Sequence, residues 1–195
     1  MLSRSLWQSA CELQTYLDLQ AFRFCFIGGV SVQRWGEPRM TEDLDLTLVI
    51  TFGQERTVAE QILLRYQSRH PQPLEFAVEA RILLLRDISG TDIDLSLGGM
   101  PFEERMVKRS TPWRVAGSGE LKTCSAEDLV VLKAFASRPQ DWIDIENVLI
   151  RQSKKLDREL IRAELSPLVE LKQEPEILNH LECLFAKHDA SSDKR

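Results

Sequence analysis

Residues 43–50 read Asp-Leu-Asp-Leu-Thr-Leu-Val-Ile, an alternation of acidic and apolar residues that leads into an apolar run. A period of two is typical of a β-strand, because successive side chains point to opposite faces of a sheet. Leu44 and Leu46 are therefore expected on a buried face. Asp43 and Asp45 are expected side by side on the other face, with their α-carbons roughly 6.5–7 Å apart. By itself, such a pair also fits a solvated strand end.

A second acidic pair, Asp92 and Asp94, lies in an alternating run at residues 91–97 that is also predicted to be a strand. The three residues 88–90, Ile-Ser-Gly, separate it from a strand-like run at 81–87 and have the length and composition of a hairpin turn. If the second pair neighbours the first, three or four carboxylates converge on one patch. Asp94 is favoured over Asp92 as a third ligand because it lies further from the turn, between two apolar residues.

Such a cluster repels itself, because two carboxylates about 5 Å apart cost roughly 3 kcal/mol at an effective dielectric constant near 20. Either protons or a hard divalent cation must neutralise it. Carboxylate oxygens suit Mg²⁺ or Mn²⁺, which bind through a few carboxylates together with substrate phosphates. Two such ions about 3.5–4 Å apart can activate an attacking oxygen and stabilise the leaving group in phosphoryl-type transfer. We therefore expect Mg²⁺ or Mn²⁺ as the cofactor.

A pair of glycines, Gly28-Gly29, ends a strand-like run at residues 23–27 and precedes a short helix predicted over 30–35. Two glycines let the backbone approach a phosphate without obstruction by side chains, and the start of a helix offers N–H groups to anionic oxygens. The pair alone also fits a plain turn between strand and helix. Its place about fourteen residues before Asp43 favours phosphate binding.

The distribution of predicted elements indicates an α+β fold in two domains. Residues 1–119 are expected to form a small mixed sheet flanked by helices, and residues 120–195 a helical domain. In the first domain, helices are predicted over 3–19, 30–35 and 54–69. In the second, helices are predicted over 125–137, 139–150, 156–165 and 176–187. Ser125 with Asp128 has the spacing of a helix N-cap.

Composition limits the possible function. The chain of 195 residues has 25 basic and 30 acidic residues, so its net charge of −5 does not fit binding of nucleic acid by bulk electrostatics. A local basic patch at Arg105, Lys108, Arg109 and Arg114 leaves an RNA or triphosphate contact open. No apolar run approaches the ~20 residues of a membrane span. Four scattered cysteines and the absence of a secretory signal favour the reducing cytoplasm.

Several motifs together resemble a known superfamily. Gly28-Gly29, Arg39-x-Thr41-x-Asp43-x-Asp45 and Ile93-Asp94-Leu95 are similar to the signature of the DNA polymerase β-like nucleotidyltransferases. More narrowly, the chain resembles the AbiEii-type nucleotidyltransferases, which are toxins of bacterial toxin–antitoxin systems. Residues 127–133 are similar to the helix that carries that family's motif lysine. Residues 138–144, Arg-Pro-Gln-Asp-Trp-Ile-Asp, are similar to its Arg-x-Lys-Asp-x-x-Asp element.

The resemblance implies a role for each matched residue. The metal ligands would be Asp43, Asp45 and Asp94, and the catalytic residues would be these three with Lys133 and Asp141. The nucleotide-binding residues would be Gly28, Gly29, Arg39, Thr41 and Lys133. Asp94 would help to activate the acceptor hydroxyl, Lys133 would contact the triphosphate, and Asp141 would serve the helical side of the site.

Two positions depart from the family pattern, because Gly29 stands where a serine is common and Gln140 stands where the family has a lysine. Plainer alternatives also remain open for three residues. Lys133 also fits a surface lysine lying along an apolar helix. Asp141 also fits a residue that favours the helix macrodipole, and Arg39 also fits a surface ion pair with a neighbour such as Glu42.

The leading hypothesis is a Mg²⁺-dependent nucleotidyltransferase that moves a nucleoside monophosphate from an NTP to an acceptor hydroxyl and releases pyrophosphate. The acceptor would be RNA such as tRNA, or a protein, and the resemblance implies an antitoxin partner. A nucleotidyltransferase that modifies a small molecule such as an antibiotic fits the same residues. From a different class, a non-catalytic NTP-binding or partner-binding module on this fold is the alternative.

Overall fold

The computed structural model describes residues 6–115, 117 and 119–192, with side chains described up to residue 189. The chain divides into two compact units. The first unit comprises the residues up to Val30 together with Met40–Cys124, and the second comprises Ser31–Arg39 together with the residues from Ser125 onward. Strand Gly119–Thr123 lies across the position of the domain boundary expected from the sequence.

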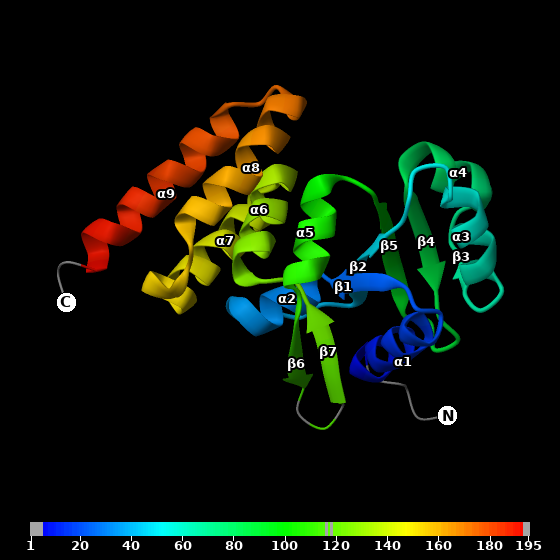
Figure 1. The fold of residues 1–195 in the computed structure, drawn as a ribbon. Coiled ribbons are helices and arrows are strands. Elements are labelled where there is room, and N and C mark those ends of the chain that lie inside the picture. Colours follow the sequence, from blue (N-terminus) through cyan, green and yellow to red (C-terminus); the bar gives the residue numbers. More distant parts are fainter. Residues whose placement is uncertain (1–5, 116, 118, 193–195) are drawn as a thin grey trace. The chain divides into compact units, whose positions relative to one another are not determined.

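The first unit is built on a seven-stranded mixed sheet whose strand order is β3-β4-β5-β2-β1-β7-β6 (Figure 1). The strands are β1 (Arg23–Phe26), β2 (Asp43–Val49), β3 (Gln67–Ser68), β4 (Ile82–Arg86), β5 (Asp92–Gly98), β6 (Thr111–Val115) and β7 (Gly119–Thr123). The central pair β2 and β5 is parallel, whereas β1 with β2 and β4 with β5 are antiparallel. The predicted α+β fold class is confirmed, and so is the expected hairpin, because β4 and β5 pair as neighbours.

The core of the first unit lies against one face of this sheet. Leu44, Leu46 and Leu48 of β2 have no exposed surface, as the alternation in the sequence predicts. The helices α1 (Leu6–Leu19), α3 (Glu55–Leu63) and α4 (Pro73–Ala80) bury apolar residues in the same cluster, and so does α2 (Gly28–Trp35) with Val30. Residues 3–5 of the expected opening helix lie outside the described residues. A further helix, α5 (Pro101–Arg109), buries Phe102 and Met106.

The second unit is helical, and α6 to α9 follow one another along the chain in green-yellow to red (Figure 1). Its helices are α6 (Ala126–Ala136), α7 (Pro139–Gln152), α8 (Arg158–Lys172) and α9 (Glu176–Ser192), with a 3₁₀ turn at Ser153–Lys155. Helix α2 (Gly28–Trp35) begins in the first unit and continues into the second. The predicted cap is confirmed, because the Ser125 side chain accepts a hydrogen bond of 3.1 Å from the Asp128 N–H.

Several predicted boundaries were wrong. The helix expected over 54–69 ends at Leu63, and the chain then enters the short strand β3. Helix α8 runs through Pro167 to Lys172, past the end expected at residue 165, although proline usually interrupts a helix. The elements α4, α5, β6 and β7 were not predicted. Strand β6 contains Pro112 and lies at the sheet edge, where a missing N–H donor is tolerated.

None of the helices within the described residues is both long enough and apolar enough to cross a membrane.

Candidate active site

The two acidic pairs lie on neighbouring strands and in the same register. Asp43 of β2 is opposite Asp92 of β5, and Asp45 is opposite Asp94. Because residues two apart share a face and the strands are parallel without offset, all four carboxylates project from one face of the sheet. This is the face opposite the buried leucines, and Asp43 is exposed while Asp45 and Asp94 are half-buried. The convergence expected from the sequence is therefore present at the level of the strands.

The glycine pair lies directly beside the first acidic pair. The N–H of Ile27, at the end of β1, donates a hydrogen bond of 2.9 Å to the carbonyl oxygen of Asp45. A Cβ atom added to Gly28 would lie 1.9 Å from Asp45 Oδ2, and Gly28 has a φ of +52°. Both the space and the backbone conformation therefore require glycine at this position.

Gly29 makes a similar close approach to a different side chain. A Cβ atom added there would lie 2.2 Å from Thr41 Oγ1. The same hydroxyl donates a hydrogen bond of 3.1 Å to Asp43 Oδ1. Thr41 thus links the glycine bend to the acidic strand. Five of the residues singled out from the sequence, Gly28, Gly29, Thr41, Asp43 and Asp45, are brought together in the first unit.

Asp94 lies opposite Asp45 on the neighbouring strand, but its carboxylate is bonded by an arginine outside this group of residues. Arg69, which follows strand β3, donates a hydrogen bond from Nη2 to Asp94 Oδ1. Sequence reasoning missed this arginine. It lies outside every motif, about twenty-five residues from its partner, and no periodic pattern connects the two.

Asp92 is held by two arginines. Arg86 Nε donates a hydrogen bond of 2.6 Å to Asp92 Oδ1, and Arg69 Nη1 lies 3.6 Å from Asp92 Oδ2. The hydrogen bond from Arg86 holds the pKa of the Asp92 carboxyl below its ordinary value. Asp92 is thus engaged in ion pairs at the edge of the acidic face, and the preference for Asp94 as the third ligand stays a prediction.

Two of the three predicted metal ligands, Asp43 and Asp45, fit a hard divalent cation. Within the described residues, no group of three His, Cys, Asp or Glu side chains is arranged to hold a metal ion. Mg²⁺ commonly binds through only one or two carboxylates and completes its coordination with water and substrate phosphates. Asp43 and Asp45 supply such a pair of hard oxygen donors on one strand, beside the bend formed by Gly28 and Gly29. The residues therefore fit Mg²⁺ or Mn²⁺ as a two-carboxylate site, and Asp94 as a third ligand stays a prediction.

Lys133, Asp141 and Asp144 form a buried ion-pair cluster in the second unit. Lys133 Nζ lies 2.7 Å from Asp141 Oδ1 and 2.9 Å from Asp144 Oδ2. The side chain of Lys133 is 8% exposed and each carboxylate is 1% exposed. The interpretation of Lys133 as a surface lysine is therefore wrong. Its contact with a triphosphate stays a prediction from the family resemblance.

Each carboxylate of this cluster is also bonded by an arginine. Arg138 donates to Asp141, with Nε 2.7 Å from Oδ2, and Arg39 donates to Asp144, with Nε 3.0 Å from Oδ1. Burial raises the pKa of both aspartates, but the hydrogen bonds from the arginines and from Lys133 outweigh it, so each pKa lies below its ordinary value. Arg39 thus pairs with Asp144 in the second unit.

Gln140 occupies the position where the family has a lysine. Its amide nitrogen donates a hydrogen bond of 3.1 Å to Asp144 Oδ1. Gln140 thus contributes a neutral donor to the cluster, in which Lys133 and two arginines already supply positive charge. Asp144 was quoted within the family element but was not predicted as a site residue.

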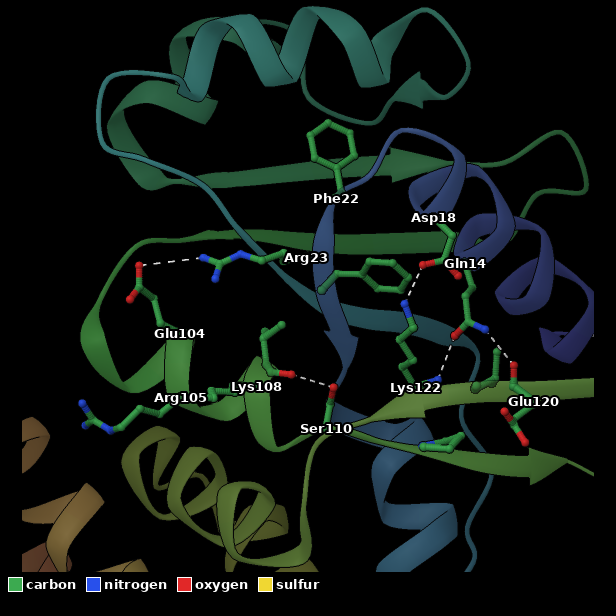
Figure 2. Close-up of a pocket in the computed structure, with 14 residues that line it drawn as sticks. Gln14, Asp18, Phe22, Arg23, Glu104, Arg105, Lys108, Ser110, Glu120 and Lys122 are labelled. Atoms are coloured by element: carbon green, nitrogen blue, oxygen red, sulfur yellow. Dashed lines mark hydrogen bonds and ion pairs between the residues drawn. The ribbon is translucent and has the colours of Figure 1, made fainter.

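A pocket of about 870 Å³ lies elsewhere in the first unit, lined by residues of α1, β1, α5, β6 and β7 (Figure 2). None of the site residues predicted from the sequence lines it. Figure 2 shows the Gln14 side chain directed at β7, where its amide donates to the Glu120 carbonyl and accepts from the Lys122 N–H, both at 2.8 Å. Arg105 and Lys108 of the basic patch also line this pocket, together with acidic residues.

Comparison with known proteins gives one family and a set of similar folds. The family model described as nucleotidyl transferase AbiEii toxin, type IV toxin–antitoxin system, matches residues 15–187. No sequence among the curated proteins matches the chain.

Two solved structures illustrate the fold similarity. An antigenic nucleotidyltransferase-like protein from Paracoccidioides brasiliensis is 17% identical with a TM-score of 0.53, over 91% of this chain and 92% of that one. The antibiotic-resistance factor ANT(2'')-Ia is 15% identical with a TM-score of 0.53, over 87% of this chain and 94% of that one. At these identities the likeness concerns the fold.

Proposed function

Because the chain belongs to the AbiEii family of nucleotidyl transferase toxins from type IV toxin–antitoxin systems, we propose that it transfers a nucleoside monophosphate from an NTP to a hydroxyl group of RNA or protein. The observation that carries this proposal is the close approach of Gly28 to Asp45, on a strand that also presents Asp43 and lies beside Asp94. A bend of two glycines that leads into a helix, next to paired carboxylates, suits an NTP held through its phosphates and a hard cation.

The reaction exchanges one bond for another at the α-phosphorus. The acceptor oxygen forms a new bond to the α-phosphorus, the bond from that phosphorus to the bridging oxygen breaks, and pyrophosphate leaves with the bridging oxygen. When bound, Mg²⁺ or Mn²⁺ supplies positive charge that offsets the charge of the phosphates and the carboxylates. Asp43 and Asp45 would hold that ion, and Asp94 would accept the proton of the acceptor hydroxyl.

The backbone around Gly28 and Gly29 would hold the triphosphate. These glycines place main-chain N–H groups at the start of helix α2, where the helix dipole favours negative charge. The Thr41 hydroxyl, which bonds Asp43, would keep that carboxylate in one orientation during the reaction. The family resemblance implies three further roles. Arg39 would bind the nucleotide, Lys133 would contact the triphosphate, and Asp141 would serve the helical side of the site.

The enzymatic proposal is tested by incubating the protein with each α-³²P-labelled NTP, Mg²⁺ and a bacterial cell extract. We expect label to enter a macromolecule with the wild type. Asp43→Asn and Asp45→Asn are expected to lose at least about 100-fold in rate, because each removes a charged ligand. Glu42→Gln is the matched control, since Glu42 is an exposed carboxylate next to Asp43 and is not among the predicted site residues. Absence of transfer by folded wild type with all four NTPs refutes the proposal.

The class of acceptor follows from the same labelled extract. Label that is removed by ribonuclease indicates an RNA acceptor, and label that is removed by protease indicates a protein acceptor. Toxicity is tested by inducing the wild type and Asp43→Ala in bacterial cells. We expect growth arrest only with the wild type and relief of that arrest by an antitoxin partner. Equal growth with both proteins refutes the toxin proposal and leaves the transferase proposal standing.

A further inference from the structure

Arg69 is held in place by the backbone of the two strands beside it. Its N–H donates a hydrogen bond of 2.8 Å to the carbonyl oxygen of Leu84. Its Nε donates one of 2.9 Å to Leu85, and its Nη2 lies 3.4 Å from the carbonyl oxygen of Ile93. The side chain is 23% exposed. The guanidinium group is therefore fixed by main-chain atoms of β4 and β5, independently of its bonds to carboxylates.

The fixed guanidinium group bonds Asp94 through only one of its two carboxylate oxygens. Nη2 donates to Asp94 Oδ1, and within the described residues Oδ2 accepts no hydrogen bond. The other side of the guanidinium group faces Asp92, whose Oδ2 lies 3.6 Å from Nη1. Asp92 is in turn held by Arg86 at 2.6 Å. The four side chains form an alternating row of charges along the edge of the acidic face.

We propose that Arg69 is a positioning residue for Asp94, a proposal that rests on the proposed function. By holding Oδ1, Arg69 selects one rotamer of Asp94 and leaves Oδ2 for the ligand or proton that the reaction brings. A carboxylate that is 42% exposed on a strand would otherwise sample several rotamers, and the productive one would be occupied only part of the time.

Arginine is required for this arrangement because of its shape. Nε and Nη2 are used at the same time, on a carbonyl oxygen and a carboxylate, and this needs a planar fork of donors. Lysine retains the charge but has a single nitrogen, so it cannot make both contacts in this geometry. Arg69→Lys therefore separates the loss of positioning from the loss of charge.

The charge of Arg69 has an opposite effect on metal binding. A positive charge bonded to Asp94 disfavours a second cation at the same carboxylate. Removing it is therefore expected to leave the affinity for Mn²⁺ unchanged or to raise it, while the loss of positioning lowers the rate. A merely structural role would instead lower stability, Mn²⁺ affinity and rate together.

The experiment compares Arg69→Gln and Arg69→Lys with Arg86→Gln as the matched control. Arg86 bonds the neighbouring Asp92, and within the described residues it forms no hydrogen bond or ion pair with Asp94. Binding of Mn²⁺ alone is measured by electron paramagnetic resonance, and kcat and KM for the NTP are measured by the labelled-transfer assay. Thermal melting of each variant is recorded as the measure of folding.

For both Arg69 variants we expect kcat to fall about 10–100-fold, as is usual when the partner that orients a ligand is lost. KM should stay within about twofold, and the Kd for Mn²⁺ should not rise. Arg86→Gln should match the wild type. Wild-type kcat in either Arg69 variant overturns the proposal, and so does a parallel loss of Mn²⁺ affinity and melting temperature in both. A wild type that transfers nothing refutes the proposed function instead, so the two failures are distinguishable.

Discussion

Replacing Lys133 with methionine is expected to destabilise the second unit by about 3–5 kcal/mol, the range found when one partner of a buried ion pair is removed. Methionine has a similar length and no charge, so the change leaves the packing volume nearly the same. It leaves Asp141 and Asp144, each 1% exposed, without the cation that lies 2.7 Å and 2.9 Å from their oxygens. The cost arises because two ionised carboxylates remain buried with less compensation.

The magnitude is expected near the lower end of that range. Asp141 keeps its hydrogen bond from Arg138, and Asp144 keeps its bonds from Arg39 and Gln140, so neither carboxylate is left bare. The loss should also shrink as the pH falls below about 4, since protonation removes the uncompensated charge.

The assay is urea unfolding followed by tryptophan fluorescence. Two of the four tryptophans, Trp35 and Trp142, belong to the second unit. In a background that carries Trp7→Phe and Trp113→Phe, the fluorescence therefore reports on that unit. No nucleotide is present, so the measurement is independent of any contact between Lys133 and a triphosphate.

Two comparisons decide the result. Lys187→Met is the control, because Lys187 is 62% exposed and its ion pair with Glu146 should contribute less than about 1 kcal/mol. Adding Asp141→Asn and Asp144→Asn to Lys133→Met should recover most of the lost stability, since the buried charges are then absent. A loss for Lys133→Met no larger than that for Lys187→Met refutes the reasoning.

Three further outcomes are expected. Gly28→Ala should lower the transfer rate at least about 100-fold, because moving a group at the site by about 1 Å costs that much. Gly90→Ala is the control for backbone strain alone, because Gly90 has a φ of +92° and no atom lies within 4 Å of an added Cβ. Equal transfer rates for the two variants would contradict the claim. The pKa of Asp144 lies below its ordinary value of 3.8, so the ionised carboxyl stabilises the folded protein at pH values above 3.8, and this stabilisation is lost as the pH falls below that value. The free energy of unfolding of Asp144→Asn should therefore depend less steeply on pH in this range, as measured by acid unfolding followed by circular dichroism. Gln14→Ala removes two hydrogen bonds to β7, so the Lys122 amide should exchange its hydrogen faster, and unchanged exchange would argue against the bridge.

Much of the fold was predictable because local patterns carry it. The alternation in residues 43–50 identified β2, and the short turn at 88–90 identified the β4–β5 hairpin. The missed elements lack such patterns. Helix α4 is only eight residues long and follows a proline-rich stretch, so its periodicity is too brief to recognise. Strand β6 contains a proline and is mostly exposed, so it shows neither alternation nor a buried run.

The sequence by itself determined which residues share a face. The strand period places Asp43 beside Asp45, on the face opposite Leu44 and Leu46. Only the tertiary structure decided that β5 lies parallel to β2 without offset, that Arg69 bonds Asp94, and that Lys133 lies buried between two aspartates. The alternation of side chains along a strand involves only a few consecutive residues. The contacts between β2 and β5, between Arg69 and Asp94, and around Lys133 depend on how segments far apart in the sequence pack, and no local sequence pattern encodes that packing.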